Sequence, residues 1–167
     1  MLENWKLWKI FEEKKDHKYY IESIKQDAEN LKLIISSYIT NPNKKNEPFT
    51  LYLCDSIKIE NVFDERAGLE KVNSYKVFFN NSIKAYRVFD EHCRLNLYSE
   101  LVQKYGNDFL RKHNYFIVEN SEYIKWFRKN SIGLNATVNL NHFVLMDSET
   151  VVEIIATNEP LVEKRQV

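Results

Sequence analysis

Residues 49–65 read FTLYLCDSIKIENVFDE, and residues 75–91 read YKVFFNNSIKAYRVFDE. The tripeptide Ser-Ile-Lys and the tetrapeptide Val-Phe-Asp-Glu recur at the same offset in both stretches. Each stretch is a short apolar run, a polar break and a second run that ends on two carboxylates. This pattern is typical of a β-hairpin, so we expect two hairpins here. A tandem duplication and a chance likeness would both explain the repetition.

Alternation inside each stretch supports the hairpins independently of the repetition, because successive side chains of a strand point to opposite faces. The apolar residues expected on one face are Leu51, Leu53, Ile57 and Ile59 in the first stretch, and Val77, Phe79, Ile83 and Ala85 in the second. The residues expected on the opposite face are Tyr52, Lys58, Glu60, Phe78, Lys84 and Tyr86. The breaks at 54–56 and 80–82 contain Asp and Asn, which tight turns favour.

Further strands are expected from the same criterion at 19–24, 31–39 and 115–118, and as a hairpin of 142–146 with 151–156. A helix over 20–33 competes with the first two of these strands, because its apolar residues also recur at helical spacing. The apolar return strand 151–156 has the composition of a strand buried on both faces. Residues 39–48 contain two prolines and three asparagines and predict a loop.

The period changes to threes and fours after His92, which predicts a helix over about 93–112. Ser121 is a suitable N-cap for a second helix over 121–130. We therefore expect an α+β fold, in which an antiparallel β-sheet built of hairpins is covered on one face by these two helices. The chain 1–167 is expected to form a single globular domain, with an N-terminal flap at 1–18 and a frayed tail at 162–167.

The composition of the chain excludes few functions, but it gives no support to several classes of function. The 24 basic residues equal the 24 acidic residues in number, so net charge favours neither nucleic acid nor an anionic membrane. The two cysteines lie in no metal or redox spacing, and no apolar run approaches a transmembrane span. We expect a cytoplasmic, bacterial protein without cofactor, because no secretory signal is visible, asparagine, lysine and isoleucine are abundant, and the three glycines form no phosphate loop.

The carboxylate pairs that end the two stretches suggest a metal site. If the hairpins lay side by side, the members of each pair would gather at one rim of the sheet, beside the histidine that follows. Carboxylates and imidazole bind Mg²⁺, Mn²⁺ or Ca²⁺, so a metal-assisted hydrolase of small substrates is one hypothesis. Its residues are Asp64, Asp90, Glu91 and His92. Charges that solvate the ends of edge strands explain the same residues without any metal.

Arg87 and the histidines are further candidates for chemistry. Continuing the alternation of Ile83 and Ala85, Arg87 would point into the core, where an ion pair with a nearby carboxylate is expected. His92, His113 and His142 could each act as a base, but a catalytic histidine also needs a nucleophile and an orienting group beside it.

The mixed polar and aromatic face of the two hairpins favours a second hypothesis, that the chain binds another protein. Interfaces are enriched in aromatic residues, and this face would carry Tyr52, Glu60, Phe78 and Tyr86. The hypothesis is a non-catalytic binding domain, such as an inhibitor or immunity-type protein, that contacts another protein or a second copy. It is preferred because the sequence carries no catalytic motif.

Overall fold

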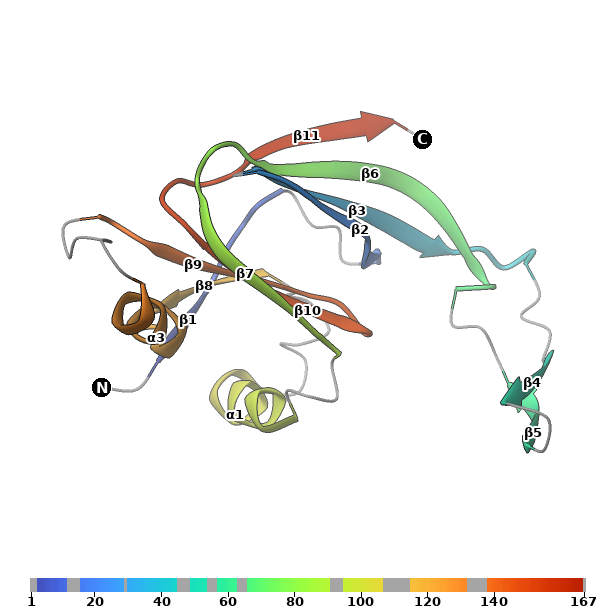
Figure 1. Ribbon diagram of the computed structural model, residues 1–167. Helices are drawn as coiled ribbons and strands as arrows, with labels where there is room; N and C mark the ends of the chain where they lie inside the picture. Colours follow the sequence, from blue (N-terminus) through green and yellow to red (C-terminus); the bar gives the residue numbers. More distant parts are fainter. Residues whose placement is uncertain are drawn as a thin grey trace.

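The computed structural model describes residues 3–11, 16–28, 30–44, 49–53, 57–62, 66–90, 95–106, 115–131 and 138–166. Only the backbone is described at 49–53, 57–62, 95–98 and 166. The architecture is α+β and mostly antiparallel sheet, as predicted (Figure 1).

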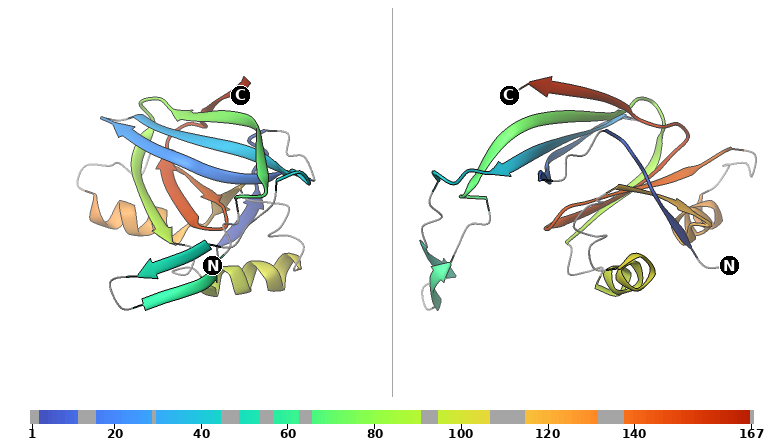
Figure 2. Two further views of the ribbon diagram at one scale, coloured as in Figure 1. Left: turned by 90° about the vertical axis from the view of Figure 1, so that its right-hand side faces the viewer. Right: turned by 180° about the vertical axis from the view of Figure 1, so that it is seen from behind.

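Two large antiparallel sheets and one hairpin make up the described strands. Sheet A has the strand order β1 (Asn4–Leu7), β8 (Tyr115–Glu119), β9 (Asn141–Met146), β10 (Thr150–Ala156) and β7 (Ile83–Asp90). Sheet B has the order β11 (Leu161–Gln166), β6 (Leu69–Phe79), β3 (Asn30–Thr40) and β2 (Lys18–Asp27). The hairpin of β4 (Phe49–Leu53) and β5 (Ile57–Val62) stands apart from both sheets (Figure 2).

The main core lies between the facing surfaces of sheets A and B. Alternate residues of β9, Phe143 and Leu145, point into it from one side, and alternate residues of β3, such as Leu33, point into it from the other. All three side chains are fully buried. This arrangement follows from the two-residue period of the strands, which collects their apolar side chains on one face.

Sheet A is also buried on the face turned away from sheet B. Val144 and Met146 of β9 pack there with Leu101 of α1 (Leu95–Tyr105), and Ile155 of β10 packs with Tyr123 of α3 (Glu122–Asn130). Both helices lie on that side of the sheet (Figure 1). Every residue from 151 to 156 is buried, which confirms the prediction of a strand buried on both faces.

The second predicted hairpin is wrong, although its two strands exist. β6 pairs with β3 and β11 in sheet B, whereas β7 pairs with β10 in sheet A. Between them the chain crosses the sandwich, with Asn81 at a φ of 49° and its N–H donating to Asn30 Oδ1 at 2.9 Å. The first hairpin is confirmed by the pairing of β4 with β5, and its turn at 54–56 lies outside the described residues. A tandem repeat of two hairpins is therefore not formed.

The predicted ends of the chain also differ from the structure. Asn4–Leu7 is not a flap but the edge strand of sheet A, paired with β8, and it buries Trp5. Residues 162–166 are not frayed, because they belong to β11 and pair with β6. The first helix is shorter than the predicted 93–112, since α1 spans Leu95–Tyr105 and residues 107–114 lie outside the described part. Neither described helix is long and apolar enough to cross a membrane.

Candidate functional site

Glu153 is a carboxylate at the centre of sheet A. It lies in the middle of β10, its side chain is 0% exposed, and it points to the helix-bearing face. Its direct neighbour across the strands is Arg87 of β7. Arg87 Nε donates to Glu153 Oε2 at 2.6 Å, and Arg87 Nη2 forms an ion pair with the same oxygen. The charge that burial would make costly is thus compensated by a hydrogen-bonded cation.

Arg87 faces the helices and not the core, so its predicted direction is wrong. The reason is a register shift between Ile155 and Ala156 of β10, where Ala85 pairs with Ile155 but Ile83 pairs with Ala156. Such a bulge interrupts the alternation, and residues after it change face. Tyr86 consequently packs towards the main core, whereas Ala85 packs on the helix side. The predicted ion pair exists, but its acid comes from a strand distant in the sequence.

Ser121, His142 and Glu153 form a series that resembles a nucleophile, a base and an orienting acid. Ser121 Oγ lies 2.8 Å from His142 Nδ1, and His142 Nε2 lies 3.6 Å from Glu153 Oε2. Ser121 Oγ also accepts a hydrogen bond from Ile124 N–H at 3.0 Å, as the N-cap of α3. The Ser121 hydroxyl has one donor and two acceptor positions, so the tautomer of the His142 imidazole decides which group donates in this bond.

Burial decides what this series can do. The exposed fractions are 3% for Ser121 and 1% for His142, so neither atom of a nucleophile–base pair can meet a substrate in this conformation. The confirmed cap also commits the serine oxygen to the helix backbone. We conclude that the series satisfies buried polar groups and fixes α3 on sheet A.

Aromatic rings flank the Arg87 guanidinium, whose side chain remains 38% exposed. The Arg87 guanidinium lies 3.9 Å from the ring centroid of Tyr123 and 5.0 Å from that of Phe89. Burial lowers the pKa of Arg87, opposed by Tyr123 and Glu3, and burial raises the pKa of Tyr123, opposed by the charge of Arg87. Arg87 stays protonated at physiological pH, because its ordinary pKa is far above that range.

The outer face of sheet B is different, because no described helix lies over it (Figure 1). One line of directly opposed residues crosses its four strands: Lys25 opposes Lys32, which opposes Phe78, which opposes Leu161. We call these four residues the sheet B row. Its members alternate with core residues such as Leu33 and Val77, so they face away from the core. The row spans about 14 Å, since neighbouring strands are about 4.8 Å apart.

The sheet B row is charged at one end and apolar at the other. Leu161 is 61% exposed, and Phe78 is half-buried beside it. Lys76, in the adjacent line, lies 5.1 Å from the Phe78 ring centroid and is paired with Glu163 at 3.0 Å. Lys25 and Lys32 have no acidic partner among the residues that the structure describes. Lys25 and Lys32 thus differ from Lys76, whose charge is neutralised on the same face.

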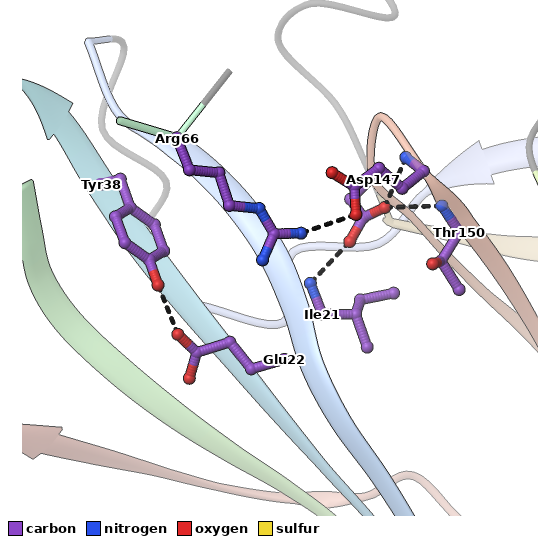
Figure 3. A network of polar contacts seen from close by, with 7 residues as sticks. Ile21, Glu22, Tyr38, Arg66, Asp147 and Thr150 are labelled. Atoms are coloured by element: carbon purple, nitrogen blue, oxygen red, sulfur yellow. Dashed lines mark hydrogen bonds and ion pairs between the residues drawn. The ribbon is translucent and has the colours of Figure 1, made fainter. Parts of the chain in front are cut away.

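A polar network occupies the other end of sheet B, next to the β9–β10 turn (Figure 3). Asp147 Oδ2 accepts a hydrogen bond from the Ile21 N–H of β2 at 2.6 Å, and its Oδ1 accepts from Thr150 N–H at 2.7 Å. Arg66 donates to Glu149 at 2.7 Å. These contacts tie the turn of sheet A to an edge of sheet B, which is a structural role.

Glu22 joins Tyr38 and Lys71 in the same network. Burial acts to raise the pKa of the Glu22 carboxyl, but hydrogen bonds from Lys71, Tyr38 and Ser36 and the charge of Lys71 lower it overall. Burial and the hydrogen bond to Glu22 raise the pKa of Tyr38 to about 12.

One tyrosine of the folded protein is accordingly expected to ionise near pH 12, later than the ordinary value near 10. A raised pKa means that the folded state holds the proton more tightly, so this contribution to stability is present below pH 10 and is lost as the pH rises towards 12. Ultraviolet absorbance titration of Tyr38→Phe should lack the late component. In Glu22→Gln the late component should move to lower pH, and an unchanged titration in both variants would contradict the assignment.

The structure separates the residues that were predicted to form one binding face. Phe78 lies on the open face of sheet B, whereas Tyr86 lies on β7 of sheet A and packs towards the main core. Tyr52 and Glu60 lie on β4 and β5, whose side chains are not described. Phe78 and Tyr86 therefore do not share a face formed by paired hairpins.

Of the predicted metal ligands, Asp90 is described and ends β7 with an exposed side chain. Asp64, Glu91 and His92 lie outside the described residues. Within the described part no group of three or more His, Cys, Asp or Glu side chains could hold a metal ion.

Sequence reasoning missed Glu153, Lys25 and Lys32. A signal for Glu153 was present, because a single carboxylate inside an otherwise apolar strand needs a buried partner. The two lysines had no such signal, since only the pairing of β2 with β3 brings them together.

Comparison with known proteins identified no relatives. No family model matches the chain, and neither a curated protein nor a solved structure matches it.

Proposed function

We propose that this chain is a non-catalytic protein-binding domain and that the outer face of sheet B, which includes Phe78 and Leu161, is the binding surface. The observation that carries the proposal is the contrast between the buried series of Ser121, His142 and Glu153 and the outer face of sheet B. Residues with catalytic potential are sealed beneath α3, whereas exposed Leu161 and half-buried Phe78 adjoin each other on an open sheet face. Contiguous exposed apolar area of this kind is typical of interaction surfaces.

The alternative candidate for the binding surface lies on α3, at Trp126. Trp126 is 57% exposed and stacks on Tyr123, with ring centroids 5.9 Å apart. Its neighbours along the exposed side of the helix are Lys125 and Lys129, which are solvated. Trp126 is thus a single exposed aromatic residue, whereas Phe78 and Leu161 adjoin each other and continue into a defined line of side chains.

The test is capture of a binding protein from an extract of the native host by the immobilised chain and by two variants. Phe78→Ser/Leu161→Ser removes the apolar end of the sheet B row, and Trp126→Ser is the matched control on α3. We expect a protein that is retained by the unaltered chain and by Trp126→Ser but lost with the double variant. Loss with Trp126→Ser alone, or turnover of esters or phosphoesters by the purified chain without any captured protein, would contradict the proposal.

A further inference from the structure

The uncompensated lysine pair points to the chemistry of the partner. Lys25 and Lys32 are directly opposed on adjacent strands, where Cβ atoms lie about 5 Å apart and like charges destabilise the sheet. The neighbouring Lys76 has its acid, Glu163, on the same face. The face therefore neutralises one lysine internally and leaves two adjacent ones with their charge directed to solvent.

We propose that the sheet B row recognises an acidic, amphipathic protein segment that presents carboxylates to Lys25 and Lys32 and an apolar side chain to Phe78 and Leu161. The inference rests on the proposed function and adds the composition of the partner and its orientation. The acidic end of the segment lies over β2 and β3, and its apolar end lies over β6 and β11. The two ends are about 10 Å apart, or about three residues of an extended chain.

Charges on the same face favour a protein over other anionic ligands. Glu163 and Glu22 also lie on sheet B, each paired with a lysine, so a phosphate backbone that extends beyond the lysine pair towards them would meet negative as well as positive charge. An anionic lipid surface gains only about 1 kcal/mol for each lysine near it, so two lysines hold a membrane weakly. A segment with two carboxylates and one apolar anchor offers a carboxylate to each lysine and an apolar side chain to the adjoining Phe78 and Leu161.

The probe for the test is an extended synthetic peptide, Glu-Ser-Glu-Ser-Leu-Ser with blocked ends, whose two glutamate side chains and one leucine side chain fall on one face. Its control is the peptide with lysine in place of both glutamates. We expect the acidic peptide to shift the backbone amide signals of the sheet B row in NMR titrations, with an affinity at least tenfold above that of the basic peptide. Raising the salt concentration should weaken this binding.

The decisive part of the experiment reverses the charge of Lys25 and Lys32 in the protein. Lys25→Glu/Lys32→Glu is expected to weaken binding of the acidic peptide about tenfold and to favour the basic peptide, whereas the control Lys129→Glu on α3 should change neither. Equal binding of both peptides, an unchanged affinity in the double variant, or preferential binding of oligothymidylate or of phosphatidylserine vesicles would overturn the inference. If the captured host protein is lost with Phe78→Ser/Leu161→Ser but is unaffected by Lys25→Glu/Lys32→Glu, the binding function stands and the acidic partner does not.

Discussion

Replacing Arg87 by alanine is expected to lower the free energy of unfolding by about 3 kcal/mol, because it leaves the fully buried Glu153 carboxylate without its compensating partner. Glu153 is 0% exposed and receives both a hydrogen bond and an ion pair from Arg87. Without the guanidinium, the carboxylate must lose its charge or draw in water. Urea unfolding followed by circular dichroism measures the difference.

The matched control removes both charges together. In Arg87→Met/Glu153→Leu no buried charge remains, so the free energy of unfolding should return to within about 1 kcal/mol of that of the unaltered chain. If Arg87→Ala costs less than about 1 kcal/mol, or if the double variant is as unstable as the single one, the ion pair does not have the structural role assigned to it.

Replacing Phe143 by alanine is the second change with a large expected effect, a loss of about 3–5 kcal/mol. Phe143 is fully buried between the sheets, with its ring centroid 4.6 Å from that of Trp8 and 5.4 Å from that of Phe79. The cavity left by the ring would lie between sheet A, sheet B and the segment that follows β1, so it cannot close without moving a sheet.

Two control variants show whether this loss is due to the cavity. Phe143→Leu keeps most of the volume and should cost well under half as much, and Val88→Ala, at an exposed position of β7, should change the free energy of unfolding by less than about 0.5 kcal/mol. A small effect of Phe143→Ala would mean that the two sheets do not share this core.

Local sequence patterns predicted where the strands and helices lie better than they predicted which strands pair with each other. The hairpin of β9 and β10 and the Ser121 cap were readable because each depends on residues close in the sequence. The pairing of β6 with β3 could not be predicted in this way. The alternation of Tyr75, Val77 and Phe79 indicates which face of the strand is buried but not which strand lies beside it. The bulge that turns Arg87 outwards depends on β10, so residues 83–90 alone could not reveal it.

The candidate surface was predictable only in part. Phe78 was identified from its place on the polar face of a strand, and it does lie on an open sheet face. Tyr86 was grouped with it because both were assigned to one hairpin, and the crossing at 80–82 separates them. Leu161 and the lysine pair belong to strands outside the predicted hairpin of Phe78, so the row became visible only with the strand order.

Lysine labelling with an acetylating reagent, read by mass spectrometry with and without the captured partner, shows directly which face of the chain the partner covers. If the outer face of sheet B is the binding surface, Lys25 and Lys32 should lose most of their reactivity in the complex, while Lys125 and Lys129 of α3 keep theirs. Unchanged labelling of Lys25 and Lys32, with protection of the two lysines beside Trp126, would contradict the account and place the interface on α3.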